Sequence, residues 1–203
     1  INTSGGTASS GNAGKAGGIV TLHAGVSGTA GEIVIGTGGN ITTTGSNAVG
    51  SANKAGGAGG DVELDTNGDS ITLTDASIST GGGTKTGTGV NDGAGGSITI
   101  KEPLLITSDV ANATNTLDTG STDAGAVTIS STINGVSGGQ DDHLDIISGT
   151  GDVTISGVIG GSASLTSLDI NTSSGDGDIS VNNIGTGASA GVSGLTRLGQ
   201  STT

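Results

Sequence analysis

Apolar residues recur two positions apart along six short segments of the chain. The pairs are Val20/Leu22, Val62/Leu64, Ile98/Ile100, Val127/Ile129, Val153/Ile155 and Ile179/Val181. Because successive side chains of a β-strand point to opposite faces, this period of two predicts strands with one buried face. It places Val62 and Leu64 inside, and Asp61, Glu63 and Asp65 outside.

A second motif, an apolar residue followed by any residue and then Thr or Ser, precedes each of these strands. The triplets are Ile1-Asn2-Thr3, Ile41-Thr42-Thr43, Ile78-Ser79-Thr80, Leu117-Asp118-Thr119, Ile146-Ile147-Ser148 and Ile170-Asn171-Thr172, and a degraded one begins at Leu198. Their starts lie 40, 37, 39, 29, 24 and 28 residues apart. A third short strand is expected in several units, at 33–35, 70–74, 104–107 and 131–133.

The variation in repeat length lies in one loop of the unit. The first three units carry a glycine-rich insertion of roughly ten residues between triplet and strand, where solenoids tolerate insertions. We therefore predict an all-β chain, a single-stranded parallel β-helix of about six to seven turns with three short strands per turn. Long Gly-rich loops at 4–18, 44–60 and 81–96 decorate its first three turns.

The domain organisation predicted from the repeat is one β-solenoid over residues 1–203, with loop-decorated turns over 1–116 and compact turns over 117–203. The chain does not begin with Met, and strand-like motifs stand at both of its ends. We therefore expect a fragment or processed piece of a longer repeat protein.

The composition favours a hydrophobic core of small cross-section and argues against some classes of partner. The 203 residues include 44 glycines and no aromatic residue, cysteine or methionine, although 30% are apolar. Five basic residues against 18 acidic ones give a net charge of −13, which argues against nucleic acid as a partner. No apolar run approaches the length of a membrane-spanning helix, so we expect no membrane insertion. Without cysteine there are no disulfides and no thiolate metal sites.

The carboxyl-terminal repeats resemble a known family. The segment GTGDVTISGVIGGSASLTSLDINTSSGDGDISVNN (149–183) is similar to repeats of large secreted bacterial surface proteins, the filamentous-haemagglutinin-like β-solenoid adhesins. The resemblance is strongest over 141–203. It implies an extracellular or cell-surface shaft, on which inserted loops or separate domains carry binding. The secretion domain typical of that family's amino terminus is not seen here.

Three of the five basic residues, Lys15, Lys54 and Lys85, fall in the three Gly-rich loops. Stacked on adjacent turns, they would form a patch that contacts a neighbouring rod or a surface polysaccharide. The alternative is that these are solvated loops whose lysines relieve acidic crowding.

Acidic residues offer candidate calcium ligands. Asp61, Asp69, Asp152 and Asp178 each follow a glycine just before a strand, and calcium between turns would relieve repulsion between stacked carboxylates. The alternative is that they cap corners. Asp141 and Asp142, beside His143 and Asp145, could hold a divalent ion or form an acidic surface turn.

The sequence gives little support for catalysis. His23 and His143 are expected on different turns, and no serine lies in a nucleophile elbow. We predict a non-enzymatic, structural extracellular rod or filament. Its partners would be copies of itself, head to tail or side by side, or further repeats of the same chain. The alternative is an adhesin binding module acting through its Gly/Lys loops. A carbohydrate-active enzyme and an ice-binding protein are minor alternatives.

Overall fold

The computed structural model describes residues 1–26, 28–50, 52–136, 141–172, 177–186 and 191–199. Across these residues the chain forms short strands and no helix, and therefore no helix that is long and apolar enough to cross a membrane. The strands form a ten-stranded and a six-stranded sheet, and every pairing between strands is parallel. The all-β, parallel solenoid-like fold predicted from the repeat is confirmed.

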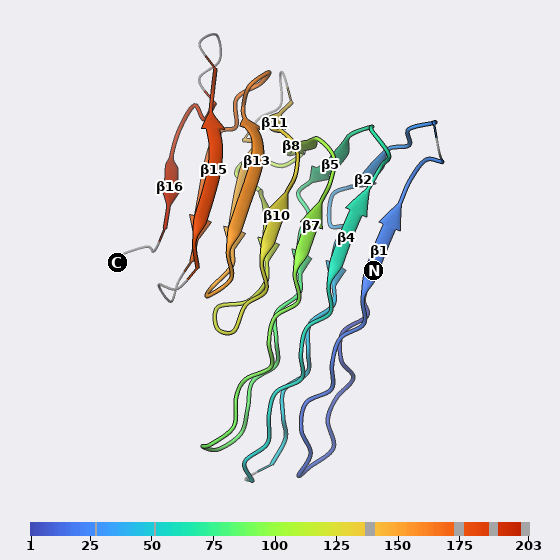
Figure 1. Ribbon diagram of the computed structural model, residues 1–203, viewed down its shortest axis with the longest axis vertical. Helices are drawn as coiled ribbons and strands as arrows, with labels where there is room; N and C mark the ends of the chain where they lie inside the picture. Colours follow the sequence, from blue (N-terminus) through green and yellow to red (C-terminus); the bar gives the residue numbers. More distant parts are fainter. Residues whose placement is uncertain (27, 51, 137–140, 173–176, 187–190, 200–203) are drawn as a thin grey trace.

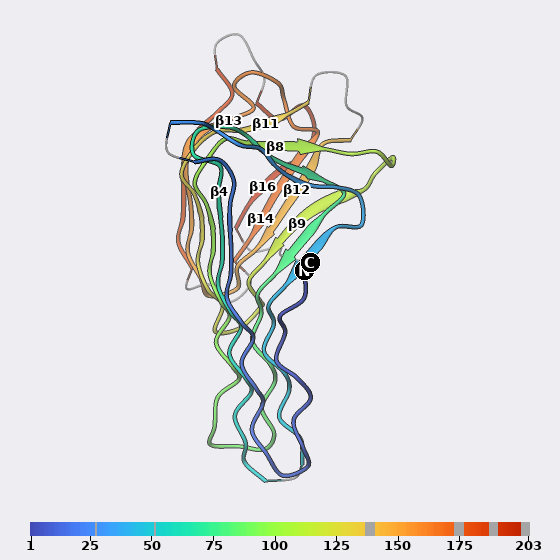
Figure 2. The same cartoon turned by 90° about the vertical axis from the view of Figure 1, so that its right-hand side faces the viewer.

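The strands line three walls, which the chain visits in turn (Figures 1 and 2). The first wall contains β1 (Val20–His23), β4 (Val62–Asp65), β7 (Ile98–Ile100), β10 (Val127–Ile129), β13 (Val153–Ile159) and β15 (Ile179–Ile184). The second contains β2 (Ile33–Ile35), β5 (Ile71–Thr74), β8 (Leu104–Thr107) and β11 (Ile133–Gly135), and it joins the first through the long β13. The third contains β3 (Asn40–Thr42), β6 (Ser77–Ser79), β9 (Thr114–Asp118), β12 (His143–Ile147), β14 (Ser167–Asn171) and β16 (Thr196–Leu198).

The register stacks equivalent residues in columns. Val20 pairs with Val62, which pairs with Ile98, and this column continues to Ile179. The triplets align in the third wall from Ile41 to the degraded copy at Leu198. Their inward side chains form one apolar core that is fully buried over most of its length. Branched aliphatic side chains fill such columns without aromatic residues because each contacts its equivalents above and below.

Corners before the third wall need a left-handed backbone. Gly38, Asp75, Asn112 and Asp141 have positive φ values of 71°, 47°, 59° and 63° and precede β3, β6, β9 and β12. Glycine, Asn and Asp tolerate this conformation best. The Asp75 carboxylate also accepts the Asp109 N–H at 3.0 Å, and that of Asp141 accepts the Asn112 N–H at 2.9 Å. Each acidic corner therefore also binds an adjacent corner.

The Gly-rich segments 4–18, 44–60 and 81–96, here called the first, second and third arms, extend from the solenoid as a two-layered block (Figures 1 and 2). On their returning halves, every third N–H binds a carbonyl of the next arm. Gly14 donates to Ala55 at 2.9 Å and Gly17 to Ala58 at 2.8 Å. A period of three is that of polyproline II rather than of a strand. The arms are thus a hydrogen-bonded block of backbone.

Hydrogen bonds also join the two layers of the block. Gly57 donates to the carbonyl of Ser46 at 2.9 Å, and Gly60 donates to that of Thr43 at 2.8 Å. The layers approach so closely that a Cβ on Gly59 would lie 1.8 Å from the Thr80 carbonyl oxygen. Glycine is required here because of this close approach.

The threonine that ends the triplet has the same structural role in three successive turns. Thr43, Thr80 and Thr119 are fully buried at the base of the arms or of the corresponding corner. Their hydroxyls donate to the carbonyls of Gly60, Gly96 and Gly125 at 2.5, 2.5 and 2.7 Å, respectively. Each hydroxyl thereby ties the end of the third wall to the chain that enters the first wall.

Two glycine substitutions test this packing. We expect Gly59→Ala to destabilise the chain by about 2 kcal/mol, since its methyl group would overlap backbone of the next turn. Gly6→Ala, also in an arm, would meet no atom within 4 Å and should leave stability unchanged or slightly raised. Urea unfolding followed by far-ultraviolet circular dichroism measures both, and equal stability of the two variants would contradict the packing.

Candidate functional site

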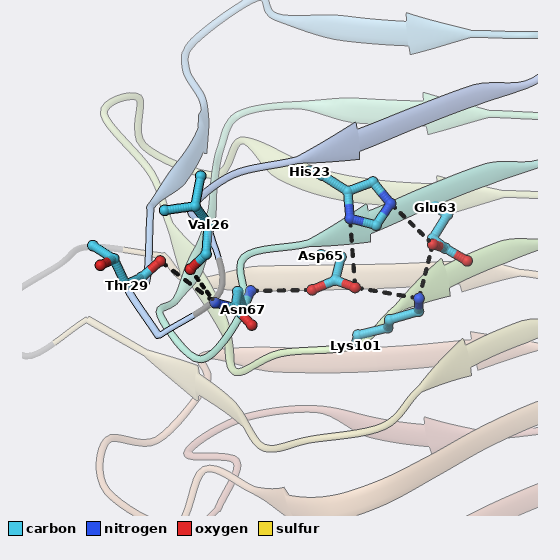
Figure 3. Close-up of polar contacts among 7 residues, drawn as sticks. All are labelled: His23, Val26, Thr29, Glu63, Asp65, Asn67 and Lys101. Atoms are coloured by element: carbon cyan, nitrogen blue, oxygen red, sulfur yellow. Dashed lines mark hydrogen bonds and ion pairs between the residues drawn. The ribbon is translucent and has the colours of Figure 1, made fainter.

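The outer face of the first wall gathers four charged or titratable side chains from three turns (Figure 3). His23 ends β1 and pairs in register with Asp65 of β4, and Glu63 lies two residues earlier on the same strand. Lys101 directly follows β7 and donates its N–H to the Leu64 carbonyl, which places it beside Asp65. We call these four residues the His23 cluster.

Lys101 lies across the two carboxylates of the His23 cluster from His23 (Figure 3). Its Nζ is 2.8 Å from Glu63 Oε1 and 3.2 Å from Asp65 Oδ2. His23 approaches the same two carboxylates, with Nε2 3.5 Å from Glu63 and Nδ1 3.7 Å from Asp65. The cluster therefore brings polar groups of three successive turns together, and Lys101 joins two of these turns by ion pairs.

The His23 cluster also contains a possible ligand set for a metal ion. One ligand atom each from His23, Glu63 and Asp65 lies within 4.8 Å of the others, and this is the only such group of three among the described residues. A mixed nitrogen and oxygen set suits zinc or a related transition metal better than calcium. The Lys101 ammonium already pairs with both carboxylates, so a divalent ion would have to compete with it.

Asp65 extends this network to a corner of the preceding turn. Its Oδ1 accepts the Asn67 N–H at 3.0 Å. The Asn67 side chain donates to the carbonyls of Val26 at 2.8 Å and Thr29 at 3.4 Å. The hydrogen bond from Asn67 and the one from Lys101 both hold the pKa of Asp65 below its ordinary value. The pKa of Lys101 is raised by hydrogen bonds to Glu63 and then Asp65.

The four corner aspartates proposed as calcium ligands bind backbone N–H groups or sit at corners. Asp61 Oδ1 accepts the Ser97 N–H at 2.7 Å, and Asp152 Oδ1 accepts the Asp178 N–H at 2.9 Å. Asp69 accepts the N–H of the next residue at 2.8 Å. Asp152 and Asp178 stack on neighbouring turns, whereas Asp61 is several turns away. These contacts favour corner capping, and calcium binding stays a prediction.

The acidic segment at 141–145 is split between different surroundings. Asp141 lies at a corner, while Asp142 is only 3% exposed and accepts the Val136 N–H at 2.9 Å. Burial raises the pKa of Asp142, against the effect of that N–H, and its Oδ1 is buried without a hydrogen-bond partner. His143 Nδ1 contacts Ser167 Oγ on β14 at 2.6 Å, and its Nε2 lies 3.8 Å from Asp141 Oδ1. These residues do not converge as a metal-binding trio within the described chain.

The three lysines of the arms occupy different halves of the block. Lys15 and Lys54 lie on returning halves, and Lys54 forms an antiparallel bridge with Thr86. Lys85 lies on the outgoing half of the third arm, where its Nζ is 3.9 Å from Asp92. The patch predicted from the three lysines is therefore spread over both layers.

A cleft of about 360 Å³ lies where the third arm meets the first turn that has no arm. Its wall on the arm side includes Gly82, Thr84 and Asp92, and the opposite side includes Asp118 and Thr122. The lining consists of hydroxyl groups, carboxylates and glycine backbone together with the side chain of Ile147. In the sequence, the only sign of this cleft is the abrupt shortening of the loop between triplet and strand after residue 117.

The His23 cluster was missed because its members are far apart in sequence. Lys101 and Glu63 are 38 residues apart. Aligning the strands VTLH, VELD and ITIK by their apolar residues would have placed His23, Asp65 and Lys101 in one column. The outward direction of Glu63 and Asp65 was predicted, and both are half-buried at the surface.

Comparisons with protein-family models, with curated proteins and with solved structures each found no match.

Replacing Lys101 tests the His23 cluster through its acid response. A carboxyl whose folded pKa is lowered contributes stability above its unfolded pKa, near 3.8, and loses it as pH falls through the folded value. Lys101→Met removes one cause of the lowering, so the variant should be less stable at neutral pH and lose less on acidification below about pH 4. Lys54→Met, whose lysine forms no ion pair with a described carboxylate, is the control. Identical urea midpoints of the two variants across this range would refute the role of Lys101.

The buried Asp142 predicts the opposite response. A carboxyl with a raised folded pKa contributes most below its unfolded pKa and loses that stability as pH rises through the folded value. Asp142→Asn should therefore be more stable than the parent chain at neutral pH, by about 1 kcal/mol. This advantage should vanish in acid. The exposed Asp123→Asn removes the same charge and should change little; a destabilised Asp142→Asn at neutral pH would show that the carboxylate itself is needed.

Proposed function

We propose that the chain is a non-enzymatic structural rod or filament subunit located outside the cell or on its surface. The observation that carries this proposal is the repeating register of the first wall, in which β1, β4, β7, β10, β13 and β15 align one column of apolar residues from Val20 to Ile179. We take the rod to comprise about six to seven turns of three short strands, with long Gly-rich arms on the first three.

Such a rod would work through its backbone. Hydrogen bonds between turns run along the rod axis, and each turn packs only on its neighbours, so length is gained turn by turn. The net charge of −13 would limit sideways clumping of rods. Copies of the chain, or further repeats of it, would be its partners.

The proposed extracellular location is based on the resemblance of the repeats to a family of secreted proteins. The strands and Gly-Asp corners of 149–183 resemble those of filamentous-haemagglutinin-like adhesins, whose solenoids form shafts. We propose the same location here on that basis.

An adhesin binding module is the second candidate, because the arms form a block that projects from the solenoid and carries Lys15 and Lys54 (Figure 2). A surface glycan or protein would contact this block. The variant with Lys15, Lys54 and Lys85 all replaced by Gln should then lose binding to the target surface. Unchanged binding would contradict the module and leave the plain rod.

Imaging the chain in its native setting tests the proposed function. Antibody labelling of intact cells, followed by cryo-electron microscopy of the labelled material, should show thin rods or fibres outside the cell envelope. Labelling that requires permeabilised cells, or compact particles in place of rods, would overturn the proposal.

A further inference from the structure

The arms bind one another through a pattern that repeats from arm to arm. On the outgoing halves, the Gly5 N–H donates to the Thr44 carbonyl at 2.8 Å, and the Gly45 N–H donates to the Gly81 carbonyl at 2.9 Å. In this register Gly5 and Gly45 occupy equivalent positions, and the equivalent donor of the third arm is the Gly82 N–H. Each arm therefore presents N–H groups toward the next arm.

The returning halves repeat the same pattern. The Gly14 N–H donates to Ala55 at 2.9 Å, and the Gly56 N–H donates to Asn91 at 3.3 Å. The equivalent donor of the third arm is the Asp92 N–H. Each arm thus presents two N–H groups, one on each half, that bind two carbonyl groups of the arm that follows it.

The fourth turn has a short corner, 119–126, in place of an arm. In the part of the chain that the structure describes, the N–H groups of Gly82 and Asp92 have no acceptor. Both residues line the cleft of about 360 Å³ beside the third arm. The cleft therefore lies where the two carbonyls of a further arm would bind.

One other donor at this edge is already capped. The Ala48 N–H of the second arm donates to the Thr84 carbonyl at 2.9 Å, whereas its equivalent, the Lys85 N–H, donates to Asp92 Oδ1 at 2.7 Å. A carboxylate here replaces the carbonyl of the missing arm. Edges of this kind are commonly protected in such ways or used to add another chain.

We propose that the cleft beside the third arm binds a Gly-rich arm of a second copy of this chain, which adds to the block as a fourth arm. This inference rests on the proposed function, because it names how the rods join side by side. The incoming backbone would supply carbonyls to Gly82 and Asp92. Packing at the spacing seen between the existing arms leaves no room for a Cβ at positions such as Gly14 or Gly56, which selects a glycine-rich segment.

A second copy carries charges that complement those of the cleft. The returning halves of its arms carry Lys15 and Lys54, and the cleft is lined by Asp92 and Asp118. The block of arms lies beside β1, β4 and β7, while the described turns at β10, β13 and β15 carry no such arm (Figure 1). The arms of a facing copy would occupy the side of the rod that these turns leave free, and they would continue an arm-to-arm interface already present within the chain.

Filling the cleft tests the docking in the full chain. Thr122→Trp places a large side chain at the exposed rim of the cleft, and Ala111→Trp places the same side chain at an exposed corner remote from the arms. Sedimentation equilibrium should show concentration-dependent association of the parent chain and of Ala111→Trp. Thr122→Trp should weaken it by about tenfold or more. Equal association of the two variants, or a parent chain that stays monomeric, would overturn the docking.

A peptide measures the cleft directly and guards against a misfolded variant. The probe is a peptide of residues 53–61, NKAGGAGGD, and its control carries Ala at all four glycines. The glycine peptide should shift the amide resonances of Gly82 and Asp92 in the parent chain, and the alanine peptide should not. Absent or equal shifts would contradict the proposal. Small-angle scattering distinguishes failure of the docking from failure of the proposed rod. An elongated monomer would contradict only the docking and would still agree with a rod.

Discussion

The hydrogen bond from a backbone N–H of one turn to a carbonyl of the next is the interaction on which the rest of this structure depends. In the walls it recurs with the geometry of parallel strands, and on the returning halves of the arms it recurs at every third residue. In the walls, strands lie about 4.8 Å apart, so equivalent side chains stack in contact. The apolar columns, the buried threonines and the His23 cluster all follow from that stacking.

The walls could be predicted from the sequence because their side chains alternate. Inward residues such as Val62 and Leu64 recur at fixed spacing, and even the degraded triplet at Leu198 proved to be in register with Ile170. The order within the arms could not be predicted in this way. Their period of three is carried by glycine N–H groups, and glycine has no side chain to mark which direction a residue faces. A glycine-rich run is therefore predicted as a loop, although many of its backbone N–H groups are hydrogen-bonded to the neighbouring arm.

The candidate sites could not be predicted from local sequence, because they depend on how the strands of neighbouring turns are aligned. Glu63 was predicted to face outward, but its pairing with Lys101 follows only once β4 and β7 are aligned across the third arm. The same register places carboxyl groups in two kinds of surroundings, which shift their pKa values in opposite directions. Asp65, near the first turns, is stabilised as a carboxylate by its donors, whereas Asp142 and Asp145, in later turns, are stabilised when protonated because burial raises the pKa of each.

Amide hydrogen exchange of the arms, followed residue by residue by nuclear magnetic resonance, tests the central claim most directly. If the arms are an ordered hydrogen-bonded block, the amides of Gly14, Gly17, Gly56 and Gly59 will exchange far more slowly than in an unfolded chain. Gly6, whose N–H has no acceptor among the described residues, will exchange fast and serve as the internal reference. Exchange of all five amides at the rate of an unfolded chain would show that the arms are loose loops and would contradict this account.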